Sequence, residues 1–145
     1  MTTYLLDVNV LVALLWPAHE ANQLALRWFQ RVGRKSWATC GITEAGFVRI
    51  VSNPAFTRDA LSPQQAIELL EANAGHPAHR LWKDESGFLS LAAPFADRIT
   101  GHRQVTDAFL LGLALRNKGK VATLDRGMLS LLPPGTPDPP LEILS

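Results

Sequence analysis

One acidic side chain, Asp7, stands in the middle of a run that is otherwise almost entirely apolar, TYLLDVNVLVALLW (residues 3–16). An ionised carboxylate is costly to bury unless it is paired, hydrogen-bonded or bound to a metal ion. Because Leu6 and Val8 flank it, a solvated position for this carboxylate is the weaker interpretation. We therefore expect Asp7 to have a polar partner or a cation, with Asn9 two residues further on.

Three more acids occur at comparable points of the chain. Asp125, like Asp7, ends a short apolar run that is typical of a strand, whereas Glu44 and Asp107 fall in the first turn of predicted helices. In an open parallel α/β sheet, the carboxyl ends of the strands and the amino ends of the following helices face the same edge. The four side chains are therefore expected to converge at that edge.

Taken singly, these acids also have purely structural explanations. Glu44 and Asp107 suit the first helical turn because the helix dipole favours negative charge there, and Asp125 suits a turn. Together, however, four carboxylates would repel one another and raise each other's pKa unless a cation held them. Oxygen ligands without a histidine or cysteine cluster select hard ions, Mg²⁺ or Mn²⁺. Such an ion activates water for attack on a phosphodiester.

The elements that must position these acids alternate along the chain. Segments typical of short strands, most of them apolar, lie at 3–7, 36–40, 79–83, 121–125 and 141–144, and helical patterns lie at 9–16, 21–34, 43–53, 62–71, 89–101 and 106–119. Thr43 is the expected N-cap of its helix, as Ser62 is before Pro63. Short strands alternating with helices predict an α/β fold with a central, mostly parallel sheet.

Length and composition limit the alternatives. With 145 residues and 47% hydrophobic content, the chain is long enough for one compact domain, residues 1–145, and too short for two ordinary ones. The single cysteine, Cys40, excludes an internal disulfide and a cysteine-based zinc site, which favours a reducing compartment and so the cytoplasm. A net charge of +1 identifies no partner by itself. No apolar run reaches membrane-spanning length, so no membrane association is expected.

Four segments resemble the acidic motifs of PIN-domain nucleases, and more narrowly those of VapC toxins from type II toxin-antitoxin modules. They are DVNVLVALL, TEAGFVRIVSNP, TGHRQVTDAFLLGLA and VATLDRG, which follow one another in this order. The phrase around Asp107 is the most specific of the four, and that around Asp125 the least. The part between Ala55 and Leu91 carries no motif of this kind.

The resemblance implies a PIN-like α/β/α sandwich and a Mg²⁺-dependent endoribonuclease that acts as a toxin. Asp7 and Asp107 match the acids that hold the metal most directly, and Glu44 and Asp125 match the other two of the acidic quartet, so that all four are expected to be catalytic and metal-binding. Members of the family usually form homodimers and bind a cognate antitoxin that occupies or blocks the acidic site. The expected partners are therefore RNA, an antitoxin and a second copy of the chain.

An acid-rich site repels RNA, so cations nearby are needed to hold the phosphate backbone. Arg49, His102 and Arg103 are the candidates, although each is also explained as a solvated charge or, for His102, as a structural hydrogen-bond partner. Asn9 and Thr123 are candidates for hydrogen bonding to the metal-binding carboxylates. Asn9 is equally explained as a helix cap.

Three other functions compete with the nuclease. A haloacid-dehalogenase-type phosphatase also begins with an aspartate after an apolar strand, but it needs a second aspartate where this chain has Asn9. A nucleotide-binding module is disfavoured because neither GxGxxG nor a P-loop lysine motif occurs. A catalytically silent RNA- or protein-binding module on the same fold remains the alternative, and the presence of all four acids favours the enzyme over it.

Overall fold

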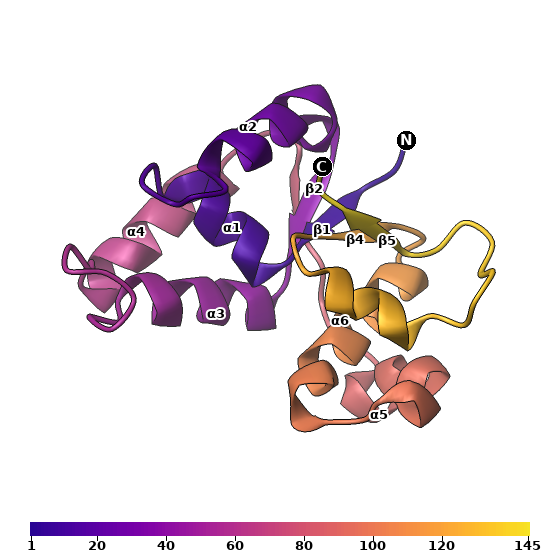
Figure 1. The fold of residues 1–145 in the computed structure, drawn as a ribbon. Coiled ribbons are helices and arrows are strands. Elements are labelled where there is room, and N and C mark those ends of the chain that lie inside the picture. Colours follow the sequence, from indigo (N-terminus) through magenta and orange to yellow (C-terminus); the bar gives the residue numbers. More distant parts are fainter.

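A sheet of five parallel strands forms the centre of the computed structural model, which describes residues 1–145 (Figure 1). The strands are β1 (Tyr4–Leu6), β2 (Trp37–Thr39), β3 (His79–Leu81), β4 (Lys120–Thr123) and β5 (Leu141–Ile143). Their order is β3-β2-β1-β4-β5, and each neighbouring pair is parallel. The predicted sheet is thus confirmed, with β1 at its centre between β2 and β4.

Helices cover both faces of this sheet. On one side lie α1 (Val8–Leu15), α2 (Asn22–Arg31), α3 (Gly41–Val51) and α4 (Pro63–Ala74), and on the other lie α5 (Gly87–Ala92) and α6 (Val105–Arg116) (Figure 1). Short 3₁₀ segments occupy Gly33–Lys35, Ala93–Arg98, His102–Gln104 and Arg126–Leu131. None of the helices has both the length and the apolar character needed to cross a membrane.

Alternation along the two central strands explains why both faces are buried. Leu5 and Val121 belong to the hydrophobic cluster under α5 and α6, whereas the next residues, Leu6 and Ala122, belong to the cluster under α1 to α4. Successive side chains of a strand point to opposite faces, so a strand covered on both sides needs apolar residues throughout. This requirement produces the continuous apolar runs that predicted the strands.

The predicted N-cap at Thr43 is wrong, because α3 begins two residues earlier. Cys40 is the N-cap residue, and the Thr43 hydroxyl accepts a hydrogen bond from the Cys40 backbone N–H at 3.0 Å. Thr43 therefore reaches back to the cap from the third helical position, as the glutamate of a capping box does. The predicted start of α4 is confirmed, since Ser62 accepts a hydrogen bond from the Gln65 N–H at 3.1 Å.

Proline and chain geometry explain the interrupted segment before α6. Residues 89–101 were expected to be helical with a break at Pro94, and the structure has α5 ending at Ala92 and a 3₁₀ segment over Ala93–Arg98. Proline lacks the N–H that an α-helix interior needs, so a tighter turn replaces the helix there.

Candidate acidic active site

Asp7 links the end of β1 to the start of α1. Its backbone N–H donates to the Ala122 carbonyl at 3.0 Å, which continues the β1–β4 ladder by one residue. Its side chain caps α1, with Oδ1 accepting from the Val8 N–H at 2.7 Å, and Oδ2 accepts from the Thr123 hydroxyl at 2.7 Å. Only 9% of the residue is exposed. The buried carboxylate predicted from the sequence therefore has two hydrogen-bond donors.

Burial raises the pKa of Asp7 above its ordinary value. The hydrogen bonds from Thr123 and Val8 oppose this shift because they stabilise the charged form, and the negative charge of Asp125 adds to it. The net direction is upward, so the two donors do not fully offset the burial of the carboxylate.

Thr123 connects three groups at this edge of the sheet. Its hydroxyl, which is fully buried, donates to Asp7 and accepts from the Asn9 Nδ2 at 3.2 Å and from the Asp125 N–H at 3.1 Å. Asn9 in turn accepts from the Leu124 N–H at 3.2 Å through Oδ1. The ends of β1 and β4 are thereby joined through side chains as well as through the strand ladder.

Asp107 lies in the first turn of α6 and is half-buried. Burial raises its pKa first of all, and the negative charges of Asp7 and then Asp125 raise it further, to about 6. The three aspartates therefore lie close enough to act on one another, although Asp107 is 100 residues from Asp7 in the chain. Repulsion among carboxylates at this edge of the sheet is what the sequence predicted.

Asp125 has both of the roles considered for it. It precedes the 3₁₀ segment Arg126–Leu131 and its Oδ1 accepts from the Gly127 N–H at 2.8 Å, so it is a turn aspartate. Its side chain is exposed, yet its charge raises the pKa of both Asp7 and Asp107. The structural explanation and the proposed functional one are compatible at this residue.

Glu44 is held by a different strand. It lies in the first turn of α3, and its Oε2 accepts a hydrogen bond from the hydroxyl of Thr39, the last residue of β2, at 2.8 Å. Glu44 is not among the charges that raise the pKa of Asp7 or Asp107. The structure thus brings three of the four predicted acids into one electrostatic cluster and holds the fourth at the neighbouring strand end.

A PIN-domain family model matches residues 4–131. The chain belongs to the PIN-domain family. Among its relatives, the ribonuclease VapC39 of Mycobacterium tuberculosis is 41% identical over 126 residues, which cover 87% of this chain and 91% of that one. The ribonuclease VapC38 of the same species is 39% identical over 141 residues, 97% of each chain. These relatives make the chain a PIN domain of the VapC type.

Two solved structures share the fold. A crystal structure of VapBC2 from Rickettsia felis, bound to a DNA fragment from its promoter, matches with a TM-score of 0.65 at 13% identity, covering 99% of this chain and 100% of that one. A structure of FitAB bound to the IR36 DNA fragment matches with a TM-score of 0.61 at 19% identity, covering 88% of this chain and 90% of that one. At such low identity these matches support the parallel-sheet architecture of the PIN domain.

None of the four acids of this PIN domain is paired with a lysine or arginine. The ion pair in the structure joins Lys120 to Asp138, whose carboxylate lies 3.2 Å from the ammonium. No side-chain cation of the chain forms an ion pair with Asp7, Asp107 or Asp125.

The donor atoms at this edge suit a hard dication. They are carboxylate oxygens and hydroxyls, with no cysteine or histidine among them, and this set favours Mg²⁺ or Mn²⁺ over zinc. No group of three His, Cys, Asp or Glu side chains is arranged so that it could hold a metal ion by itself. Mg²⁺ usually keeps several of its waters and binds through one or two carboxylates together with substrate phosphates. The open arrangement of these acids fits that mode of binding.

The three side chains predicted to bind RNA lie on two different elements, α3 and the segment that leads into α6. Arg49 is exposed on α3 and, with Glu44, lines an open hollow of about 660 Å³ between α3 and α4. His102 and Arg103 are exposed in the 3₁₀ segment that leads into α6, a few residues before Asp107. All three side chains are accessible to a ligand.

Sequence reasoning missed Thr39 and His79. The Thr39 hydroxyl lies 2.8 Å from Glu44 and 2.7 Å from Nε2 of His79, the first residue of β3. His79 falls in the stretch without a recognisable motif, so nothing in the sequence marked it. Thr39 carried a usable signal, because it is a polar side chain near the end of an apolar strand, as Asp7 is.

Proposed function

We propose that this protein is a Mg²⁺-dependent endoribonuclease, with Mn²⁺ as a possible substitute, and that it is the toxin of a VapBC-type toxin-antitoxin module. The observation that carries the proposal is the group of aspartates Asp7, Asp107 and Asp125: the charge of Asp125 raises the pKa of Asp7, the charges of both raise the pKa of Asp107, and none of the three has a cationic partner in the chain. The names of the relatives, VapC ribonucleases at 36–41% identity, supply the reaction and the substrate class.

In this proposal, Asp7 and Asp107 hold the ion most directly, and Glu44 and Asp125 complete the set, one of them through water. When bound, Mg²⁺ supplies the charge that lowers the pKa of the attacking water and neutralises the departing oxygen. Asp7 contributes an oxygen that is already oriented, because its rotamer is fixed by donors at both oxygens. Thr123 and Asn9 act by holding that orientation.

The three cations have the role of binding substrate. Arg49, His102 and Arg103 are exposed on α3 and just before α6, the helices that carry Glu44 and Asp107, and in this proposal they contact the RNA backbone and offset its repulsion from the acids. The expected products carry a 5′-phosphate and a 3′-hydroxyl, because the nucleophile is water rather than the ribose 2′-hydroxyl and the bond that breaks is that between phosphorus and the 3′ oxygen.

The test is cleavage of labelled RNA by the purified protein with Mg²⁺, with Mn²⁺ and with EDTA. The proposal expects cleavage that depends on the ion, and 5′-phosphate ends that can be ligated directly. Cleavage that persists in EDTA, or products with a 2′,3′-cyclic phosphate, would overturn the mechanism. Intact RNA under all conditions, together with Mg²⁺ binding, would favour the silent binding module instead.

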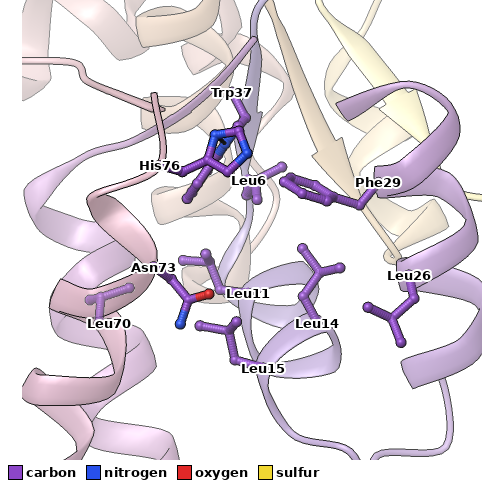
Figure 2. Close-up of a pocket in the computed structure, with 10 residues that line it drawn as sticks. All are labelled: Leu6, Leu11, Leu14, Leu15, Leu26, Phe29, Trp37, Leu70, Asn73 and His76. Atoms are coloured by element: carbon purple, nitrogen blue, oxygen red, sulfur yellow. Dashed lines mark hydrogen bonds between the residues drawn. The ribbon is translucent and has the colours of Figure 1, made fainter. Parts of the chain in front are cut away.

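The proposed protein partners are a cognate antitoxin and a second copy of the chain. An apolar hollow of about 220 Å³ lies between α1, α2 and α4, and Figure 2 shows Leu14, Phe29 and Leu70 converging on it. Such a hollow suits the apolar side chains of a bound antitoxin segment. Trp28 lies in the core rather than at this hollow, and its Nε1 donates to the Glu142 carboxylate at 2.6 Å. Light scattering with and without the antitoxin tests both associations.

A further inference from the structure

Two threonines flank the central strand in equivalent positions. Thr123 ends β4 and Thr39 ends β2, the two strands that border β1, and both side chains are fully buried. Each hydroxyl donates to one acid of the quartet, Thr123 to Asp7 at 2.7 Å and Thr39 to Glu44 at 2.8 Å. The support of Asp7 thus has a counterpart on the other side of β1.

The two threonines also share the way in which they are held. Asn9 donates to Thr123, whose hydroxyl can then give its single proton to Asp7. On the other side, Nε2 of His79 lies 2.7 Å from the Thr39 hydroxyl. An ionised Glu44 only accepts, so a Thr39 hydroxyl that donates to it can accept from the ring only when His79 carries its proton on Nε2. His79 therefore corresponds to Asn9.

The histidine ring is itself fixed by packing. It lies against the buried ring of Trp37, with centroids 4.6 Å apart and planes inclined at 56°. Burial lowers the pKa of His79, and the charge of Glu44 and a hydrogen bond to the Ala74 backbone oppose that shift, which places the Glu44 carboxylate within electrostatic reach of the ring. Trp37, His79 and Thr39 thus form a rigid support that spans β2 and β3.

This support leaves one oxygen of Glu44 free. Oε2 takes the hydrogen bond from Thr39, whereas Oε1 receives none from the protein. A glutamate has three rotatable bonds, and fixing them in advance removes an entropic cost from any later binding step. The hydrogen bond at Oε2 therefore orients Oε1 without occupying it.

We propose that Thr39 and His79 are positioning residues that orient the Glu44 carboxylate towards the metal site, as Thr123 and Asn9 orient Asp7. The inference rests on the proposed function, since it assumes that Glu44 contributes to ion binding. It adds a role for β3 and for the segment around it, to which no motif assigned one.

The first experiment is calorimetric titration of the full-length, metal-free protein with Mn²⁺. Thr39→Val, which keeps the shape and removes the hydroxyl, should weaken Mn²⁺ binding by about 10- to 100-fold, the usual effect of losing a hydrogen-bond partner of a metal ligand. Thr39→Ser should restore most of the affinity. Unchanged or tighter binding in Thr39→Val would overturn the inference.

The histidine is tested with a matched pair. His79→Gln keeps an N–H donor near the position of Nε2 and should bind Mn²⁺ better than His79→Leu. The double variant of Thr39→Val with His79→Leu should be no weaker than Thr39→Val alone, because the two residues act in series. His76→Gln serves as the control, since His76 also lies near Trp37 but makes no contact with Thr39. Additive losses of Mn²⁺ affinity in the double variant would show that His79 does not act through Thr39.

A readout without metal comes from long-range ¹H–¹⁵N NMR of the histidine rings. The wild-type protein should show the neutral His79 ring protonated at Nε2, and Thr39→Val should change that pattern. Protonation at Nδ1 would overturn the proposed chain of donors. If the wild-type protein bound no Mn²⁺ at all, the proposed function itself would fall, whereas normal wild-type binding with an unaffected Thr39→Val variant would reject only this inference.

Discussion

Thr123 and Asp7 lie 116 residues apart in the chain, yet the hydroxyl of one donates to the carboxylate of the other at 2.7 Å. The pairing of β1 with β4 brings them together, because Leu6 is in register with Ala122 and the next residue on each strand faces the same edge. A fully buried hydroxyl beside a nearly buried carboxylate fixes the carboxylate in one rotamer. This hydrogen bond should therefore affect both ion binding and the free energy of unfolding.

Replacing Thr123 by valine should weaken Mg²⁺ or Mn²⁺ binding by about 10- to 100-fold, because the Asp7 carboxylate loses its orienting donor. The free energy of unfolding should also fall, by about 1–3 kcal/mol, since the Asn9 amide and the Asp125 N–H lose their acceptor. Titration calorimetry and urea unfolding measure the two effects. Thr123→Ser is the matched control, and equal affinity for valine and serine variants would contradict this role.

Replacing Asp7 by asparagine should lower the rate of RNA cleavage by orders of magnitude and leave the fold intact. The asparagine oxygen can still accept from the Val8 N–H, so the cap of α1 survives. Removal of the negative charge relieves the repulsion with Asp125 and Asp107, whereas the amide NH₂ group that replaces Oδ2 no longer accepts from the Thr123 hydroxyl, so the melting temperature of the metal-free protein should change little. A fluorogenic RNA assay and differential scanning fluorimetry suffice. Wild-type activity in the purified variant would reject Asp7 as a catalytic residue.

Ion binding should be pH-dependent in a defined direction. The pKa of Asp107 is raised to about 6, so below that pH the residue carries a proton that Mg²⁺ must displace. Affinity should therefore fall as the pH drops from 7.5 to 5.5, with release of up to one proton per ion bound. Calorimetry in buffers of different ionisation enthalpy counts that proton. In Asp107→Asn this proton release should disappear, and an undiminished release would assign it to another group.

The raised pKa of Asp107 affects the stability of the metal-free protein in the opposite direction: stability should rise, not fall, as the pH drops. The folded-state pKa of Asp107 lies above its ordinary value, so the native protein holds a proton that the unfolded chain gives up between about pH 4 and 6. Through this residue the metal-free protein gains stability as the pH falls through 6, and loses it as the pH rises. The contribution is modest because Asp107 is only half-buried, and it should be absent in Asp107→Asn.

Most of the fold was predictable because the sheet is buried on both faces. A central strand must then be apolar on both faces, as at Leu5 and Leu6, and such a run is short and bounded by a helical pattern. The predicted helix start at Thr43 was wrong because two different cap arrangements use the same residue type. A threonine can cap from its own position or from three residues inside the helix, and the sequence pattern does not distinguish these.

The candidate site was predictable only in part, for a related reason. Asp7, Asp107 and Asp125 follow from the rule that strand ends and helix starts share an edge, which requires no side-chain conformations. The hydrogen bond of Glu44 depends on a rotamer and on a hydroxyl from β2, and His79 reaches Thr39 from a strand with no motif. Such contacts appear only when the register of β2 and β3 is known.

Gly112 should tolerate no side chain. It lies in α6 where this helix packs on α5, and a Cβ there would overlap the Leu91 carbonyl. Gly112→Ala gains about 1 kcal/mol of helix propensity but forces the two helices apart, which should leave a net loss of about 2 kcal/mol in the free energy of unfolding. Urea unfolding measures it. Gly41→Ala is the control, because that helical glycine has open space around it and should lose no stability.

Arg49 should contribute to RNA binding through phosphate contact rather than base recognition. In the Asp7→Asn background, where RNA stays intact, Arg49→Ala should weaken binding to all sequences alike. It should also lower the slope of log affinity against log salt concentration by about 0.7, the value for one single-strand phosphate contact. Fluorescence anisotropy at several salt concentrations gives the slope. The matched control is Arg34→Ala, since Arg34 is exposed just before β2, at the opposite edge of the sheet from the acids, and should leave the slope unchanged. Equal slopes in Arg49→Ala and its parent would remove this arginine from the RNA path.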